Sequence, residues 1–178
     1  MVDELIRLLD VPGELLVIVI AALPLVELRG AIPAGIGLFR LEWHVVFLLA
    51  VFGNLLPVPV LLLFFQTLVK YIGRGRVGAK LIGPVVRHAE RHTETIEKYE
   101  RIGLMIFVAI PLPWTGAWTA SMLASLLGIT FRRAFFSVAA GVIISGAIVT
   151  TLVLLGWIGA VIAGLALITL AIISLTKM

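Results

Sequence analysis

Pro24-Leu-Val-Glu-Leu-Arg-Gly-Ala-Ile-Pro33 is the stretch of sequence that decides the fold. It lies inside an apolar segment, residues 14–40, that is long enough to cross a bilayer, which takes about 20 apolar residues. Proline removes a backbone donor and clashes with the preceding helical turn, and glycine adds backbone freedom. We therefore expect Pro24, Gly30 and Pro33 to break the helix, leaving two short apolar arms around a polar tip.

A second apolar segment, residues 103–130, has the same design. The residues expected to break it are Pro111, Pro113 and Gly116. Each broken segment is followed by a further apolar run, and when the two halves are aligned Gly53 meets Gly141 within one residue. This correspondence predicts an internal repeat.

The composition indicates a membrane protein. Of the 178 residues, 61% are hydrophobic and 13% are charged, and the mean hydropathy is +1.18. Soluble domains are about 45–50% apolar, so a soluble fold could not bury this much apolar surface. The net charge of +4 comes largely from basic residues clustered in 70–101, which is typical of a cytoplasmic loop near anionic lipid and does not indicate nucleic-acid binding.

Basic residues concentrate in cytoplasmic loops of membrane proteins, and this rule favours re-entrant hairpins over five simple spans. We predict an all-α, polytopic membrane protein with two inverted repeats, each a re-entrant hairpin followed by a transmembrane helix. The predicted segments of this single membrane domain are an N-terminal segment (1–13), hairpin one (14–40), a transmembrane helix (43–69), a loop with an amphipathic helix (70–102), hairpin two (103–130), and transmembrane helices at 133–155 and 159–176.

The predicted location is the inner or plasma membrane, with the N-terminus outside. The loop 70–102 and the C-terminus are then cytoplasmic, because this orientation places the basic residues inside.

Glu27 and Arg29 are the charged residues of the first tip, and no other charge lies between Glu14 and Arg40. A charge at the bilayer centre costs on the order of 2.5–3.5 kcal/mol, so such residues are candidates for function. In the functional interpretation Glu27 takes up and releases a proton, and Arg29 either lowers the pKa of Glu27 or binds an anionic group. In the structural interpretation the two charges neutralise each other, or the tip lies shallow near the membrane interface.

The second tip carries no charge, but it offers polar donors. Thr115 and Thr119 supply hydroxyls, and Trp114 and Trp118 supply indole N–H groups. These tryptophans are either part of a polar site or interfacial anchors. Asn54, within an apolar run, is a further candidate for the same site, or it makes a simple interhelical hydrogen bond.

Enzymatic and cofactor chemistry are not indicated. The sequence has no cysteine, and no nucleophile and base occur at a recognisable spacing. His88 and His92 lie four residues apart, but no third ligand is near them and arginines flank them. We therefore expect no metal and no cofactor.

Two stretches of the chain resemble a known family. Glu27-Leu-Arg-Gly-Ala-Ile-Pro33 and Pro111-Leu-Pro-Trp-Thr-Gly-Ala-Trp118 are similar to the signatures of the small multidrug export protein family. That family is remotely similar to the DedA, or SNARE-associated Golgi protein, superfamily. The resemblance implies paired re-entrant hairpins and a proton-coupled or lipid-translocating role, and it places Glu27 and Arg29 at membrane-embedded ionisable positions. The DedA pattern has further arginines in its second half, whereas the second tip here is neutral.

These observations predict a proton-coupled secondary transporter or exporter whose site lies where the two hairpin tips meet. The expected partners are membrane lipids, a small-molecule, ion or lipid substrate, and a second copy of the chain in a homodimer. The alternatives are a lipid translocase, in which Arg29 and the basic helix handle a phosphate headgroup, and a non-transporting scaffold.

Overall fold

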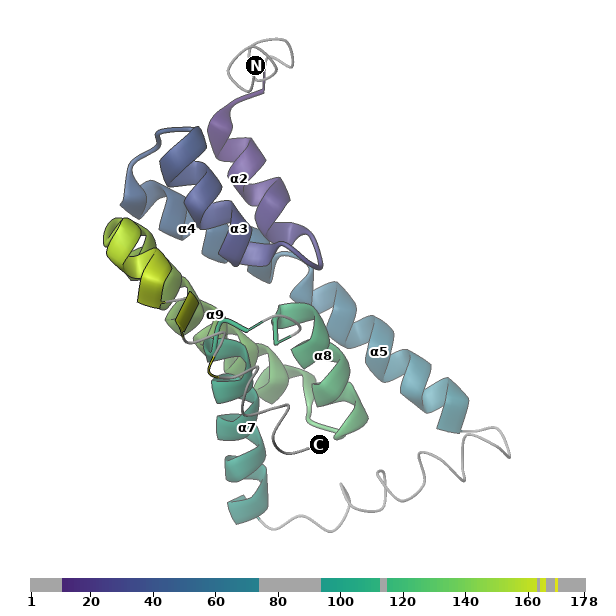
Figure 1. The fold of residues 1–178 in the computed structure, drawn as a ribbon. Helices are drawn as coiled ribbons and strands as arrows, with labels where there is room; N and C mark the ends of the chain where they lie inside the picture. The colour runs from purple at the N-terminus through teal and green to yellow at the C-terminus, as the bar shows by residue number, and fades with distance from the viewer. Residues whose placement is uncertain (1–10, 74–93, 113–114, 163, 166–168, 170–178) are drawn as a thin grey trace.

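The computed structural model describes residues 11–73, 94–112, 115–162, 164–165 and 169. All regular structure in these residues is helical (Figure 1), which confirms the predicted all-α class for this part of the chain. The helices are α2 (Gly13–Ala22), α3 (Glu27–Pro33), the π-helix η1 (Ala34–Leu38), α4 (Trp43–Leu55), α5 (Val58–Gly73), α7 (Glu94–Ala109), α8 (Ala117–Leu126) and α9 (Phe131–Leu154).

Two helical stretches of the described residues are long and apolar enough to cross a membrane. They are Trp43–Tyr71, with a mean hydropathy of 2.5, and Phe131–Leu154, with a mean hydropathy of 2.2. The second lies close to the predicted span 133–155. The first differs from the predicted single helix 43–69, because it consists of α4 and α5 with an interruption at 56–57. Two prolines, Pro57 and Pro59, lack the backbone N–H groups that would continue the helix there.

The first predicted break lies between α2 and α3. Leu23 is extended, with φ −71° and ψ 140°, as expected for a residue before proline. The chain turns over residues 23–26 and then returns alongside α2 (Figure 1). A Cβ on Gly13 would lie 3.2 Å from the Phe39 Cβ, so the returning arm ends beside the start of α2. The two arms therefore form a helical hairpin.

Gly30 and Pro33 do not break the helix, although both residues were predicted to do so. Both lie within α3. A side chain on Gly30 would overlap Val26, so the glycine allows the turn to pack closely against its helix. Pro33 cannot donate to the preceding turn, and η1 follows it directly, with Phe39 N–H donating to the Ala34 carbonyl at 3.0 Å. A local widening of the helix thus accommodates the proline.

The second predicted break lies between α7 and α8, over residues 110–116. Its first proline, Pro111, follows the end of α7, whereas Pro113 lies outside the described residues. The boundary expected at 102–103, between a surface helix and the hairpin, is absent because α7 runs without interruption from Glu94 to Ala109. No proline interrupts this stretch, and a Cβ on Gly103 would meet nothing within 4 Å.

Other predicted segments fall largely on residues that are not described. These are most of the N-terminal segment 1–13, residues 79–93 of the amphipathic helix, and much of the span 159–176. Residues 157–162 are helical.

In each half of the chain, a glycine lets the helix that follows the broken segment pack directly on the first arm of that segment. A Cβ on Gly53 of α4 would lie 2.5 Å from the Ile18 carbonyl oxygen in α2. A Cβ on Gly141 of α9 would lie 2.7 Å from the Met105 carbonyl oxygen in α7. Glycine is the residue that permits such close helix contact. The two positions aligned in the sequence therefore make equivalent contacts.

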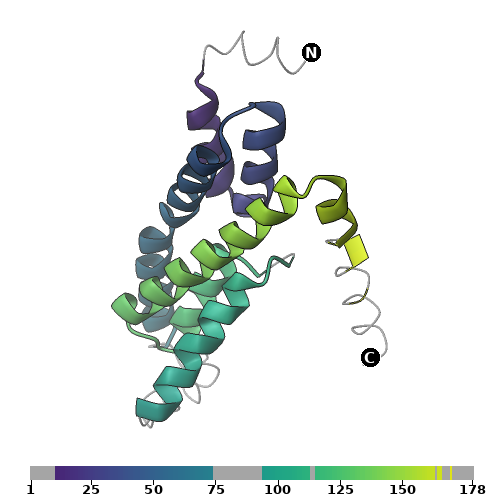
Figure 2. The same ribbon diagram turned by 90° about the vertical axis from the view of Figure 1, so that its left-hand side faces the viewer.

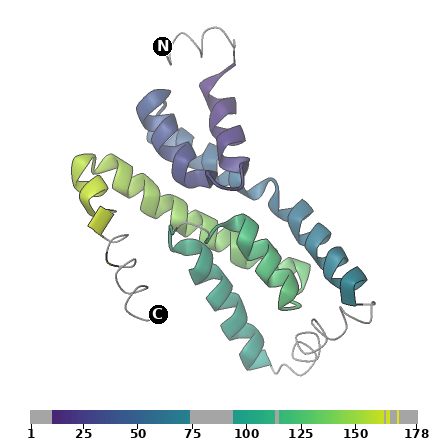
Figure 3. The same ribbon diagram turned by 45° about the vertical axis from the view of Figure 1, so that its right-hand side comes forward.

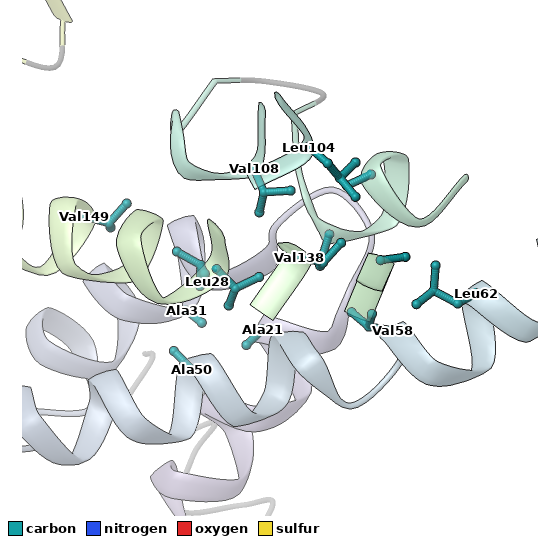
Figure 4. Close-up of a cluster of buried hydrophobic side chains, with 14 of the residues drawn as sticks. Ala21, Leu28, Ala31, Ala50, Val58, Leu62, Leu104, Val108, Val138 and Val149 are labelled. Atoms are coloured by element: carbon teal, nitrogen blue, oxygen red, sulfur yellow. The ribbon is translucent and has the colours of Figure 1, made fainter. Parts of the chain in front are cut away.

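The core is built largely from small side chains. It joins residues of all the α-helices listed above (Figure 4), and alanine and valine predominate in it. The α2–α3 pair lies toward one end of the molecule and the α7–α8 pair toward the other (Figure 3). The long helix α9 runs diagonally along α7 (Figure 2) and also contacts α3, α4 and α8. This packing brings the two breaks together near the middle.

Candidate functional site

The Glu27 carboxylate, which belongs to the first hairpin, is buried against the start of α8. Helix α8 is the second arm of the second hairpin. Glu27 is 5% exposed, and its carboxylate accepts hydrogen bonds from the backbone N–H groups of Trp118 and Ala117. Both donors belong to the first turn of α8. The first hairpin therefore supplies an acceptor to the beginning of a helix in the second.

The sequence around Gly116 explains why α8 needs this acceptor. The first amides of a helix have no partner within the helix, and a side chain at the N-cap usually binds one of them. Gly116 is the N-cap of α8 and has no side chain. A Cβ at this position would overlap the Glu27 carboxylate. The glycine thus leaves the space that the carboxylate fills, and the negative charge is favourable at the positive end of the helix dipole.

Arg29 binds the carbonyl side of the same break. Its guanidinium donates to the Leu112 carbonyl and, at 2.8 Å, to the Thr115 carbonyl. The nearest Arg29 and Glu27 side-chain atoms, Nη2 and Oε2, are 4.0 Å apart. The two charges therefore lie close together, but their hydrogen bonds go to opposite kinds of backbone group: amides for the acid and carbonyls for the base.

The second hairpin also satisfies a backbone group of the first. The indole Nε1–H of Trp118 donates to the Ala22 carbonyl at 3.3 Å. Ala22 is the last residue of α2, where helix carbonyls lack partners. We call this set of contacts, from Ala22, Glu27 and Arg29 to residues 112–118, the tip junction.

The hydroxyls of Thr115 and Thr119, two predicted site residues, bind backbone groups within the second break. Thr115 Oγ1 lies 2.8 Å from the Ile110 carbonyl oxygen, to which it donates, and it accepts from the Leu112 N–H at 3.2 Å. Thr119 Oγ1 accepts from the Gly116 N–H at 3.1 Å. Both hydroxyls thus bind backbone groups that the prolines leave without helical partners.

Asn54 of α4 brings an unpaired polar group to the junction. It is 1% exposed, and its amide lies near the Glu27 carboxylate. Within the described residues neither Asn54 Nδ2 nor Oδ1 has a partner at hydrogen-bonding distance, and Arg29 Nε has none either.

The backbone at Glu27 is strained. Its φ is +50°, in the left-handed region that non-glycine residues seldom adopt and that costs on the order of 1–3 kcal/mol. The same residue carries the carboxylate that binds the first amides of α8. Strain of this kind is concentrated at functional sites.

Most of the predicted site residues meet at this junction. Glu27, Arg29 and Trp118 bind backbone groups across it, Thr115 accepts from Arg29 Nη2 at 3.3 Å, and Asn54 lies beside Glu27. Trp114 lies outside the described residues. The roles of Gly116 as an open N-cap and of the Leu112 carbonyl were not predicted; a glycine directly before a helix of small residues is the signal that could have indicated the former.

A family model described as "Putative small multi-drug export protein" matches residues 27–148, which is more than half of the chain. The chain belongs to this family. The matched region begins at Glu27 and extends into α9, so it contains both charged residues and the whole second break. Membership confirms the predicted resemblance and, with the two apolar spans, identifies a helical membrane protein of an export family. No curated protein and no solved structure matches the chain.

Replacing Gly116 with alanine tests the junction. The added methyl group would displace the Glu27 carboxylate from the α8 amides, and charged hydrogen bonds are worth about 1.5–3 kcal/mol each. We expect Gly116→Ala to lower the free energy of unfolding in detergent micelles by roughly 3 kcal/mol.

The matched control is Gly103→Ala, because a Cβ there meets nothing within 4 Å and alanine favours a helix. This control should be neutral or slightly stabilising. Equal stabilities of the two variants would contradict the proposed geometry.

Proposed function

We propose that this protein is a proton-coupled secondary exporter whose transport site lies at the tip junction. The observation that carries the proposal is the buried Glu27 carboxylate, which is held by the amides of another hairpin in a chain of an export family. Ionisable residues buried in membrane proteins commonly belong to proton and substrate pathways.

Proton uptake by Glu27 weakens the junction in this proposal. The ionised carboxylate makes charge-assisted hydrogen bonds to α8, which are roughly twice as strong as neutral ones. It also gains from the helix dipole. A protonated Glu27 loses both contributions, while Arg29 keeps its bonds to the break carbonyls. The tips are then free to separate on one side.

The same carboxylate provides coupling between proton and substrate. A cationic substrate binds the ionised form and a proton occupies the neutral form, so the two compete for Glu27. Competition for one site gives exchange of substrate for proton when the site opens to the two sides in turn. The unpaired atoms of Asn54 and Arg29 offer further polar contacts to the substrate, and Trp118 forms part of its wall.

In this proposal both hairpins are re-entrant and enter from opposite sides. One arm of each hairpin is clearly too short to cross: α2 and α8 have 10 residues each, about 15 Å at 1.5 Å per residue, against a hydrocarbon core of about 30 Å. The equivalent contacts of Gly53 and Gly141 support two related halves. An inverted pair of halves gives two equivalent states, one open to each side.

Cysteine labelling tests the topology, and the chain contains no cysteine of its own. Single cysteines at Glu14 and Arg40 mark the two ends of hairpin one, and cysteines at Arg101 and Arg132 mark those of hairpin two. We expect a membrane-impermeant maleimide to label the first two from outside intact cells and the last two only after permeabilisation. Labelling of Glu14→Cys and Arg40→Cys from opposite sides would show that the first hairpin crosses the membrane.

Flux measurements test the function of Glu27. In proteoliposomes with an imposed pH gradient, we expect the rate of cation export by the Glu27→Gln variant to fall at least about tenfold. A tenfold change corresponds to a loss of about 1.4 kcal/mol in binding free energy. The residual flux should no longer depend on pH. The matched control, Glu42→Gln, removes an exposed carboxylate and should keep wild-type flux. Undiminished, pH-dependent flux in Glu27→Gln would remove Glu27 from the mechanism.

A further inference from the structure

A groove of about 410 Å³ lies between α7 and α9, and its lining residues take no part in the tip junction. Its lining includes three arginines, Arg101, Arg132 and Arg133, and the apolar residues Ile102, Met105 and Phe136. All three arginines are exposed. The groove therefore joins a concentrated positive charge to an apolar wall.

The charge of the groove is suited to an anion. Among the described residues that line it there is no acidic side chain, and two of its arginines occupy the first turn of α9. Positive side chains in the first turn of a helix are unfavourable because they lie at the positive end of its dipole. α9 has neither a side-chain cap nor an acidic residue in that turn. A bound phosphate would counter this charge, and arginine is well matched to phosphate oxygens.

The apolar wall distinguishes a lipid from a free anion. Phe136 is 67% exposed and Ile102 is 39% exposed, and both line the groove beside the arginines. Inorganic phosphate would use the arginines alone. A phospholipid would also cover the apolar side chains with its acyl chain, and basic pockets between helices on the cytoplasmic side are typical sites for anionic headgroups.

We propose that this groove binds an anionic phospholipid, with its phosphate on Arg101, Arg132 and Arg133 and an acyl chain along Ile102 and Phe136. The assignment does not depend on the transport mechanism, since none of these residues belongs to the tip junction, but it uses the proposed topology, in which the groove lies on the cytoplasmic side. It places a lipid between the first arm of hairpin two and the long helix that packs on it.

Lipid titration in detergent tests the site, using phosphatidylglycerol as the probe and phosphatidylcholine as the uncharged reference. We expect phosphatidylglycerol to raise the unfolding temperature of the wild type more than phosphatidylcholine does. Each of Arg101→Gln and Arg132→Gln should weaken the phosphatidylglycerol affinity roughly fivefold, since a basic residue near anionic lipid contributes about 1 kcal/mol. The control Arg40→Gln should leave the affinity unchanged.

The proposal would be overturned by equal responses to the two lipids, or by unchanged phosphatidylglycerol affinity in the Arg101→Gln/Arg132→Gln variant. A response to inorganic phosphate equal to that of the lipid would also overturn it, by showing a free-anion site. A second measurement uses Phe136→Trp, whose added fluorescence should be quenched more by brominated phosphatidylglycerol than by brominated phosphatidylcholine. Equal quenching by the two lipids counts against the site even if the arginine variants fold poorly.

Discussion

A helix that breaks inside a bilayer leaves backbone amides and carbonyls that lipid cannot satisfy, and the proposed re-entrant arrangement of this molecule depends on how those groups are paired. Non-helical backbone at membrane depth is tolerated only where protein or a water-filled cavity supplies partners. Here Glu27 pairs with the amides that begin α8, and Arg29 pairs with the carbonyls that precede it. The hydroxyls of Thr115 and Thr119 bind two further backbone groups of the same break. The two charges are thus the partners that make the second break compatible with burial.

This arrangement gives the charged residues a structural role, and in the proposed mechanism the same contacts also serve transport. The functional and structural interpretations of Glu27 and Arg29 were alternatives at the level of sequence, yet the same hydrogen bonds serve both. Removing one partner of a buried charge pair usually costs about 3–5 kcal/mol because the other charge is left unpaired, so loss of either residue is expected to destabilise the fold. In the proposed mechanism the strength of the junction depends on the ionisation of Glu27, so a proton changes how firmly the two hairpins are joined. The left-handed backbone at Glu27 is consistent with a residue held in place by these contacts.

The sequence predicted the class of the protein and the existence of both breaks, because hydropathy and proline act locally. It also singled out Glu27 and Arg29, since charges are conspicuous in an apolar segment. It did not predict their partners, because residue spacing within one segment carries no information about which backbone groups of a distant segment lie opposite. The positions of Gly30 and Pro33 inside α3 show the limit of local rules, since a π-turn absorbs the proline. The interruption at 56–57 has a visible cause in Pro57 and Pro59, whose missing donors act even within a strongly apolar run.

Chemical crosslinking in the membrane tests most directly whether the two tips meet. The Trp118 indole reaches the Ala22 carbonyl, so a chain carrying Ala22→Cys and Trp118→Cys should be joined within one molecule by a short bifunctional thiosulfonate in proteoliposomes. A chain carrying Ala22→Cys and Gly103→Cys should not be joined, because Gly103 faces open space on α7. Efficient intramolecular crosslinking of the first pair alone is the predicted result. Failure of the first pair to crosslink, or crosslinking only between separate molecules, would contradict a tip junction built by Glu27 and Arg29.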